Sequence, residues 1–524
     1  MTETNESYFV QLSGATIWPK VFEQLSPLAE LKFGILDGRN IPRFEELFPS
    51  ARFLDGTAIK HGIWSRGDSA SLPDEVRLHP AFLRREKEAY YGMQRQFTGG
   101  RMSFTEMRLV LSSLADYLWG FFEGQNISFG VLTEAPHTHG GQILAGIAEA
   151  CDIPLLHFQQ TSICSAVRPV LGPTYSTMNF REFETEDQRA RRQHNLVQEA
   201  HLIEQFVADA KDVKRYAREL SFLEKDTKMF RGSKGIVRRF FVPYFWRVEE
   251  YRLFKAALHS GLDVPHSIGA MTPEDSILRA VIKPAFSSTV EQRKILRECR
   301  AALQEVAVGH VPNTYATFFM HFEPEKTSVP DGGLFGDQLL AIRRCAAALG
   351  NGTTLIVREH PSQLTLLKRG FRARSASFYR EIDSIPNVTV VSDAVPHNEV
   401  LPGSDMVFTL TGKVALEALS LGIPVVALGH AWYDAVPGVF SVSRCGSVKA
   451  CIDAARTFEF SPDFDLASEI REALENEFLL VRVNPSSDRH LHADEDVDSL
   501  VNILRFVAEN VEIIRSSFLS LKDV

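Results

Sequence analysis

The chain has 524 residues, of which 44% are hydrophobic and 23% charged, and its formal net charge is -9 at pH 7. This length allows roughly two to four domains of about 150 residues each, and the composition is that of an ordinary globular protein. The negative net charge argues against a general nucleic-acid binder. The six cysteines show no CxxC spacing, so neither a zinc site nor a disulfide framework is indicated.

The first ten residues, MTETNESYFV, are polar and lack the apolar core of a secretory signal. Nowhere does the sequence contain a run of about 18 apolar residues, which a helix needs in order to cross a bilayer. We therefore expect a reduced, cytoplasmic protein.

The first clear α/β pattern lies between residues 127 and 161. ISFGVLTEA (127–135) is typical of a buried strand, GGQILAGIAEACD (140–152) of a helix and IPLLHFQQT (153–161) of the next strand. Strands joined by a helix at this spacing predict a parallel pair with a right-handed crossover. From about 185 to 310 the pattern changes to long, charged, helix-like segments.

A second α/β pattern occupies residues 311–430. A helix is predicted at GDQLLAIRRCAAALGNG (336–352), where Gly350 closes it. Apolar, β-rich runs alternate with helical patterns throughout, which predicts a parallel, Rossmann-like sheet. The predicted strands are 314–322, 353–359, 387–393, 405–410 and 424–429.

These patterns predict an α/β fold with two Rossmann-like domains. Residues 1–310 form the N-terminal domain, which includes the helical segment at about 185–310. Residues 311–524 form the C-terminal domain, with a helical tail after about 494. Ligands of open parallel sheets bind beyond the carboxyl ends of the strands, so two facing domains predict a cleft lined by strand-to-helix loops.

TLTGKVALEALSLGIPVVALG (409–429) places a Gly-Lys pair between a strand and a helix. A P-loop needs a glycine five residues before Gly412 and serine or threonine after the lysine. Val407 and Val414 stand at these positions. The NTPase interpretation therefore fails, and another role for the turn is needed.

The helix N-terminus after this turn suits an anion, through its backbone N–H groups and the hydroxyls of Thr409 and Thr411. Lys413 and Glu417 fall on one polar stripe of the helix, and Glu417 could accept hydrogen bonds from a ribose diol. The alternative is that Lys413 and Glu417 form an exposed ion pair one turn apart, without a ligand.

Polar side chains also follow two other predicted strands of the C-terminal domain. In VREHPSQ (357–363), proline forces His360 towards an extended backbone at the strand end. His360 then points into the predicted cleft, unless it is an ordinary packed histidine. HFEPEKTSVPDGG (321–333) gathers acidic, basic and hydroxyl groups, which suit either a ligand loop or a solvated connection.

TEAPHTHGG (133–141) places Glu134 at the end of a strand in the N-terminal domain. A carboxylate there could act as a base or a nucleophile towards a substrate in the cleft. The HxH spacing of this segment resembles a metal pair, but no third ligand is identifiable. The acids of HLHADEDVDS (490–499) are explained by the dipole of a C-terminal helix, so no metal is predicted.

Residues 228–255 mix eight lysines and arginines with many aromatic side chains. Such a segment docks at an anionic membrane surface or holds a polyanionic glycan. The alternative is a helix that buries its aromatic side chains in the protein, with its arginines outside.

Together these motifs resemble the capsule polysaccharide biosynthesis family of bacterial glycosyltransferases, which includes the Kdo transferases of capsule export systems. The resemblance is carried by FFMHFEPEKTSVPDGGLFGDQLLAIR (318–343), LIVREHPSQ (355–363) and VPHNEVLPGSDMVFTLTGKVALEALSLGIPVVALGHAWYD (395–434). GVLTEAPHTHGGQILAGIAEACDIPLL (130–156) supports it more weakly. About 40% of the chain is covered, and the helical segment at 185–310 is not.

The resemblance implies the GT-B fold, in which two Rossmann-like domains face a cleft and the C-terminal one holds the nucleotide sugar. It further implies that His360 and Pro361 touch the nucleotide, as the His-Pro motif does in CMP-sugar transferases. Related sialyltransferases carry serines in the phosphate loop, whereas this chain has threonines followed by Gly-Lys, so the nucleotide stays open. The residues implied at the phosphate and ribose are Thr409, Thr411, Gly412 and Glu417.

In the mechanism that this family implies, helix N–H groups, hydroxyls, Lys413 and His360 stabilise the departing phosphate without a metal. Glu134 is the expected acceptor-side base or sugar nucleophile. The predicted function is transfer of Kdo or a related acidic sugar from a nucleotide sugar, such as a CMP-linked one, to a polysaccharide or glycolipid. The donor is a substrate, and no further cofactor is expected.

Two other functions fit the same motifs. One is a polyol-phosphate transferase that uses a CDP-alcohol, and the other is a non-catalytic partner in polysaccharide assembly. In each case we expect a cytoplasmic protein, with peripheral contact with the inner membrane or the export machinery as an option, and no nucleic-acid partner.

Overall fold

The computed structural model consists of two compact units, each of which is described by itself. The first includes residues 1–200 and 474–524, and the second includes residues 285–473. The residues that the structure describes are 6–12, 17–65, 70–96, 104–161, 163, 166–172, 176–177, 185–211, 251, 255, 283–365, 370–392, 395–480 and 495–522.

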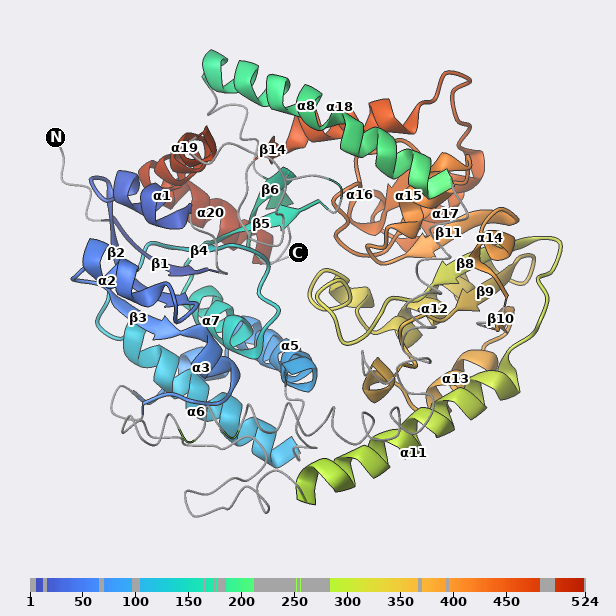
Figure 1. The fold of residues 1–524 in the computed structure, drawn as a ribbon, viewed down its shortest axis with the longest axis horizontal. Coiled ribbons are helices and arrows are strands. Elements are labelled where there is room, and N and C mark those ends of the chain that lie inside the picture. Colours follow the sequence, from blue (N-terminus) through green and yellow to red (C-terminus); the bar gives the residue numbers. More distant parts are fainter. Residues whose placement is uncertain are drawn as a thin grey trace, which may run out of the picture. The chain divides into compact units, whose positions relative to one another are not determined.

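The first unit is built on a sheet in the order β14-β6-β5-β4-β1-β2-β3, with β7 paired to β6 (Figure 1). Strands β1 to β5 pair in parallel, whereas β6 pairs antiparallel with β5, β7 and β14. The strands are β1 (Glu6–Gln11), β2 (Ala29–Leu36), β3 (Arg52–Asp55), β4 (Phe129–Leu132), β5 (Leu155–Gln160), β6 (Ala166–Leu171), β7 (Ser176–Thr177) and β14 (Leu479–Leu480).

Helices cover both faces of this sheet because successive side chains of a strand point to opposite faces. In β1, Tyr8 and Val10 join one hydrophobic cluster, and Phe9 joins the other. The helices are α1 (Trp18–Leu25), α2 (Ile41–Leu47), α3 (Gly56–Lys60), α4 (Asp74–Arg77), α5 (Pro80–Gln96), α6 (Phe104–Phe122), α7 (His139–Ala150), α19 (Glu495–Glu509) and α20 (Val511–Lys522).

The second unit contains six strands, all parallel, in the order β10-β9-β8-β11-β12-β13. Counted within the unit this order is 3-2-1-4-5-6, the doubly wound Rossmann order. The strands are β8 (Tyr315–Phe319), β9 (Thr354–Arg358), β10 (Val388–Val391), β11 (Ser404–Thr409), β12 (Val425–Ala427) and β13 (Val439–Ser441).

The helices of the second unit begin and end where the sequence supplies caps. Helix α12 starts after Asp337, whose carboxylate accepts the N–H groups of Leu339 and Leu340, and it ends at Gly350 with φ 72°. The helices are α12 (Gln338–Leu349), α13 (Ala376–Asp383), α14 (His397–Val400), α15 (Val414–Ser420), α16 (Val442–Cys445) and α17 (Val448–Thr457), with short 3-10 helices η4 (Gly333–Phe335) and η5 (Gly370–Ala373).

Three further helices contain residues of both units: α8 (Glu186–Lys211), α11 (Lys283–Val306) and α18 (Leu466–Glu477). They confirm helical structure at both ends of the predicted 185–310 segment. The basic and aromatic segment 228–255 lies outside the described residues, apart from Tyr251 and Lys255. None of the described helices is long and apolar enough to cross a membrane.

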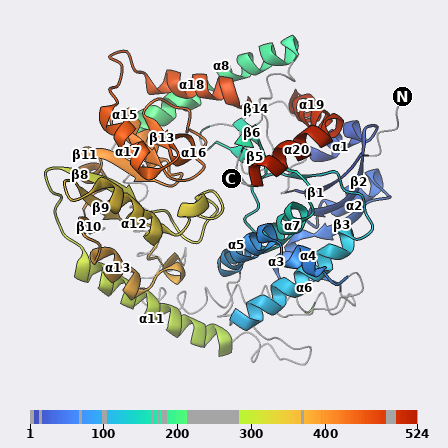
Figure 2. The same ribbon diagram turned by 180° about the vertical axis from the view of Figure 1, so that it is seen from behind.

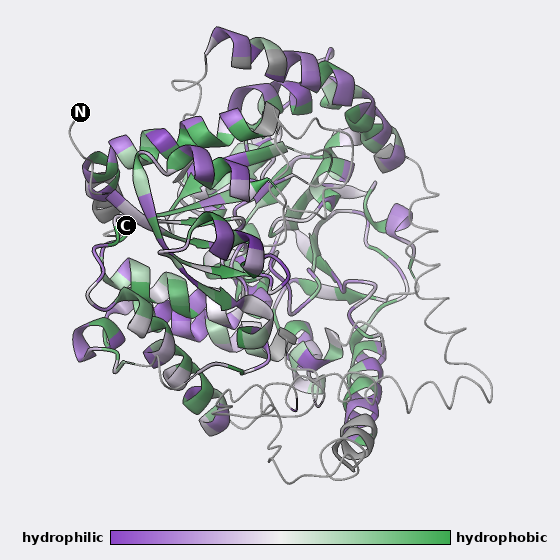
Figure 3. Ribbon diagram, turned by 60° about the vertical axis from the view of Figure 1, so that its left-hand side comes forward, coloured by the Kyte–Doolittle hydropathy of each residue, from purple (hydrophilic) through white to green (hydrophobic). Residues whose placement is uncertain are grey.

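The prediction of an α/β fold with two Rossmann-like domains is confirmed, since each unit has its own parallel-rich sheet. Each of the five strands predicted between 311 and 430 corresponds to an observed strand, β8 to β12. Figure 3 colours most strands hydrophobic, as expected for sheets covered on both faces. The predicted cleft between facing domains stays a prediction.

The C-terminal tail lies elsewhere than predicted. It was expected in the domain 311–524, but β14 pairs with β6 and α19 contacts α1, so the tail belongs to the first unit (Figures 1 and 2). Leu500 and Leu504 of α19 are fully buried in the cluster that contains Trp18. Helical periodicity reveals an apolar face but not the sheet that covers it.

Substituting Leu504→Ala is expected to lower the free energy of unfolding of the first unit by about 3 kcal/mol, because it leaves a cavity in a packed core. Arg505, the next residue, is exposed. Arg505→Ala is therefore the matched control, with an expected change of about 0.5 kcal/mol or less. Urea unfolding monitored by circular dichroism measures both, and equal losses would contradict the docking of α19.

Candidate functional site

The candidate site lies at the carboxyl edge of the second sheet, between β8 and β11. These strands are neighbours, and the strand order reverses between them. Parallel sheets bind ligands at such a switch point, outside the carboxyl ends of the strands. His321 follows β8, and the Thr409–Lys413 turn follows β11.

His321 links the two strand ends. Its Nε2 lies 3.0 Å from the Thr409 hydroxyl and accepts the N–H groups of Leu410 and Thr411, each at 3.2 Å. Burial lowers the pKa of His321 to about 3, and the nearby His360 contributes to the shift in the same direction. The imidazole is therefore neutral at physiological pH.

The turn after β11 is held by internal hydrogen bonds. The hydroxyl of fully buried Thr409 accepts the Gly412 N–H at 3.1 Å, and the Tyr433 hydroxyl donates to the Gly412 carbonyl at 2.7 Å. A Cβ on Gly412 would lie 2.7 Å from Thr409 Oγ1, so glycine is required there. The hydroxyl of Thr411 donates to the Thr327 carbonyl at 3.2 Å.

This geometry changes the predicted phosphate contacts. The N–H groups of residues 410–412 and the hydroxyl of Thr409 are already bonded inside the protein, so these groups shape the turn. The helix that follows, α15, has only seven residues and begins after exposed Lys413. Contact of Thr411 and Lys413 with a phosphate stays a prediction.

His360 lies where predicted, two residues beyond β9, and is partly buried. Its Nδ1 accepts the N–H of Ser362 at 3.1 Å, and its ring meets the Phe322 ring edge-on at 5.7 Å between centroids. In the neutral ring the proton therefore lies on Nε2. Pro361, also partly buried, opens the turn that carries this bond.

Glu417, on α15, is hydrogen-bonded to His397. The distance from His397 Nε2 to Glu417 Oε2 is 2.9 Å, and the side chains are 19% and 18% exposed. The His397 ring also packs on Phe319 at the end of β8, with 5.0 Å between centroids. Glu417 is thereby held near the switch point.

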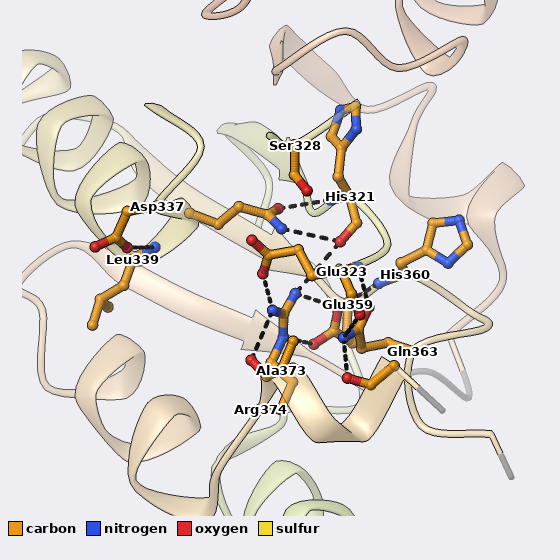
Figure 4. A network of polar contacts seen from close by, with 12 residues as sticks. His321, Glu323, Ser328, Asp337, Leu339, Glu359, His360, Gln363, Ala373 and Arg374 are labelled. Atoms are coloured by element: carbon orange, nitrogen blue, oxygen red, sulfur yellow. Dashed lines mark hydrogen bonds and ion pairs between the residues drawn. The ribbon is translucent and has the colours of Figure 1, made fainter. Parts of the chain in front are cut away.

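Beneath the loops lies a buried charge cluster, drawn in Figure 4. The side chain of Arg374 is fully buried between Glu323 and Glu359, and it bonds both carboxylates. Tyr379 donates to Glu359 Oε2 at 2.8 Å, and Glu359 Oε1 accepts the His360 N–H at 2.8 Å. The cluster thus fixes the backbone that carries His321 and His360.

The loop 323–336 folds back over the turn after β11. Lys326 pairs with Asp331 at 2.9 Å, and the Asp331 carbonyl accepts the His430 N–H at 2.7 Å. A Cβ on Gly332 would lie 2.3 Å from the Ser328 carbonyl, so this compact loop needs glycine there. The HFEPEKTSVPDGG segment is therefore a compact loop packed on the turn after β11, and its role as a ligand loop stays a prediction.

In the first unit, Glu134 lies two residues beyond β4, at the position where that strand order reverses between β1 and β4. Its Oε2 is 3.8 Å from His137 Nδ1, and its side chain is 25% exposed.

His139 is fully buried, with its Nε2 3.2 Å from the Ile59 carbonyl. Burial lowers the pKa of His139 to about 4. The HxH pair therefore does not present two accessible imidazoles.

In the part of the chain that the structure describes, no group of three or more His, Cys, Asp and Glu side chains is arranged to hold a metal ion.

The sequence interpretation missed three residues of the site: His321, Arg374 and His397. His321 lies near the end of the predicted strand 314–322, and His397 follows the predicted strand 387–393. Nothing local in the sequence marks Arg374.

Residues 335–442 match the model of a family described as capsule polysaccharide biosynthesis proteins. A search of curated protein sequences found no match.

Among solved structures, the chain is similar to KpsC, the beta Kdo 2,7 transferase of Thermosulfurimonas dismutans, at 8% identity and a TM-score of 0.26, over 95% of this chain and 100% of that one. It is also similar to the UDP-GlcNAc 2-epimerase of Methanocaldococcus jannaschii, at 10% identity and a TM-score of 0.23, over 89% and 98%. Values this low assign no activity.

The family match covers part of the site, whereas β8, His321 and most of the loop 323–336 lie before it. The matched residues contain β9 to β12, His360 and the turn after β11, and they include both Glu417 and its partner His397. Residues 335–442 are therefore similar to the capsule polysaccharide biosynthesis family, whose motifs the sequence resembles.

Proposed function

We propose that the protein is a metal-independent glycosyltransferase, which moves a sugar from a nucleotide-sugar donor to a capsule or other surface polysaccharide, or to a glycolipid. Kdo or a related acidic sugar is the proposed cargo. The observation that carries the proposal is that Glu417 and its partner His397 lie near the switch point between β8 and β11, and that both residues belong to the family-matched segment.

In this proposal the donor nucleotide binds at the carboxyl edge of the second sheet. Glu417, held by His397, accepts hydrogen bonds from the ribose hydroxyls. His360 offers its Nε2–H towards the nucleotide, with Pro361 shaping that turn. In the turn after β11, Lys413 supplies positive charge towards the phosphate, and Thr411 gives up its bond to the Thr327 carbonyl to donate its hydroxyl there.

Transfer breaks the bond between the anomeric carbon and the phosphate oxygen of the nucleotide, and the bonding electrons leave with the phosphate. The acceptor hydroxyl attacks the anomeric carbon, and its proton passes to the Glu134 carboxylate. The transition state carries positive charge on the sugar and growing negative charge on the phosphate. Fixed hydrogen-bond donors at the phosphate therefore accelerate the reaction.

A panel of CMP-, UDP- and GDP-linked sugars and CDP-glycerol, incubated with purified protein, tests the proposal through nucleotide release. Turnover of at least one nucleotide sugar is expected. Release from CDP-glycerol alone would instead identify a polyol-phosphate transferase. Glycan binding without any release would identify an assembly partner, which is the non-catalytic alternative.

For the donor site, His360→Ala is expected to raise the dissociation constant of the released nucleotide about 10-fold, the value of one lost hydrogen bond of about 1.4 kcal/mol. Isothermal titration calorimetry measures this, with thermal unfolding as the control for the fold. Unchanged nucleotide affinity would remove His360 from the donor site. Contact with the inner membrane or with export machinery stays a prediction.

A further inference from the structure

Three hydrogen-bond donors converge on one nitrogen of His321. The N–H groups of Leu410 and Thr411 point to Nε2, and the Thr409 hydroxyl, which accepts from Gly412, also lies 3.0 Å from it. A nitrogen that accepts N–H groups cannot carry a proton. The neutral ring must therefore carry its proton on the other nitrogen, Nδ1.

Nothing in the described part of the chain accepts a hydrogen bond from this Nδ1–H. The hydrogen bonds of the His321 ring to described residues all involve Nε2, and the residue remains 7% exposed. The ring is fixed between β8 and β11, because its backbone N–H and carbonyl are both bonded by the Gln338 amide, at 2.7 and 3.0 Å. The structure thus holds one oriented N–H at the switch point without a protein acceptor.

We propose that Nδ1–H of His321 donates a hydrogen bond to the phosphate of the nucleotide donor. This inference rests on the proposed function, and it adds a contact that the sequence motifs did not assign. A fixed neutral donor strengthens its hydrogen bond as the leaving phosphate gains charge. It also requires no protonation step, since the pKa of His321 is about 3 and the ring keeps one form across the working pH range.

Two amide substitutions separate this role from the structural role of the ring. In His321→Asn, an amide nitrogen stands near the Nδ1 position, but the acceptor for the turn is lost. In His321→Gln, the amide oxygen reaches towards the Nε2 position and keeps that acceptor, but the Nδ1 donor is lost. A phosphate contact predicts that the glutamine variant loses more turnover, whereas a purely structural role predicts that the asparagine variant does.

We expect His321→Gln to keep a melting temperature near that of the wild type and to lose about 100-fold in kcat, the usual effect of removing one oxyanion donor. His321→Asn should be less stable but retain kcat within about 10-fold of the wild type, since it keeps a donor at the phosphate. Full activity of the glutamine variant would overturn the inference.

A second test uses the wild-type protein and so does not depend on the folding of the asparagine variant. Protein labelled with ¹⁵N-histidine is titrated with CMP, UMP, UDP and GDP and with their nucleosides, and the His321 resonances are assigned by comparison with the glutamine variant. The Nδ1–H tautomer is expected between pH 5 and 8, with a shift of Nδ1 on binding of a nucleotide but not of a nucleoside.

The two hypotheses fail differently in this experiment. If no nucleotide binds by calorimetry, the proposed donor site itself is wrong. If a nucleotide binds and the Nδ1 resonance does not change, or if the proton is found on Nε2, only the role of His321 is wrong.

Discussion

Replacing Arg374 by methionine is expected to lower the free energy of unfolding of the second unit by about 3–5 kcal/mol at pH 7, the usual cost of breaking a buried ion pair. The guanidinium is fully buried, and its two carboxylate partners are only 12% and 4% exposed. Methionine fills similar space but leaves Glu323 and Glu359 buried side by side without a cation.

The loss of unfolding free energy in Arg374→Met should become smaller as the pH falls. Burial already raises the pKa of Glu323 above its usual value, although Arg374 opposes the shift. Without Arg374 the pKa of Glu323 rises further. The Glu323 carboxylate then binds a proton in the folded state at a pH where the same group in the unfolded chain does not. Folding is then favoured as the pH falls from the folded-state pKa towards about 4.5, and the variant regains stability in that window.

Urea unfolding at pH 7.5 and pH 5.5 measures both effects. Arg343→Met is the matched control, because Arg343 also pairs with a glutamate, Glu381, but the two side chains are 49% and 53% exposed. Exposed pairs contribute about 1 kcal/mol or less. A loss in the Arg374 variant no larger than in the control, or one that grows at pH 5.5, would contradict the account of the cluster.

The second sheet was largely predictable from the sequence, because buried parallel strands are short continuous apolar runs. TLIVR of β9 and DMVFT of β11 show this pattern directly. Strands β1 to β3 were not predicted. In β2, exposed Glu30 and half-buried Lys32 interrupt the apolar run, so the strand does not stand out from its neighbours.

Pairing between distant segments explains most of what the sequence could not reveal. His321 meets Thr409 88 residues further along the chain, and Arg374 meets Glu323 across 51 residues. No local spacing encodes such contacts. The positions of His360 and Glu417 could be predicted, because each follows its own strand, but their partners could not. The docking of the C-terminal tail on the first sheet is missed for the same reason.

Loss of the Glu417 carboxylate should have the largest effect on donor binding. In Glu417→Ala, the dissociation constant of the nucleotide is expected to rise about 10- to 100-fold, since hydrogen bonds to a charged group contribute about 1.5–3 kcal/mol. In the proposed site, the hydrogen bonds that this variant loses are those from the ribose hydroxyls to the Glu417 carboxylate. The wild type should therefore prefer a ribonucleotide to its 2′-deoxy analogue, and the variant should bind the two equally.

His397→Ala tests the hydrogen bond that holds this carboxylate. It leaves Glu417 in place but removes the imidazole 2.9 Å from Oε2, so a smaller loss of nucleotide affinity is expected, of about 3- to 10-fold. Because the imidazole acts through Glu417, its removal should change nothing further in the Glu417→Ala background. Calorimetry of the two single variants and the double variant forms a double-mutant cycle. Additive losses would mean that His397 contacts the nucleotide by itself. If Glu417→Ala still preferred a ribonucleotide to its 2′-deoxy analogue as strongly as the wild type does, the ribose would bind elsewhere on the sheet edge.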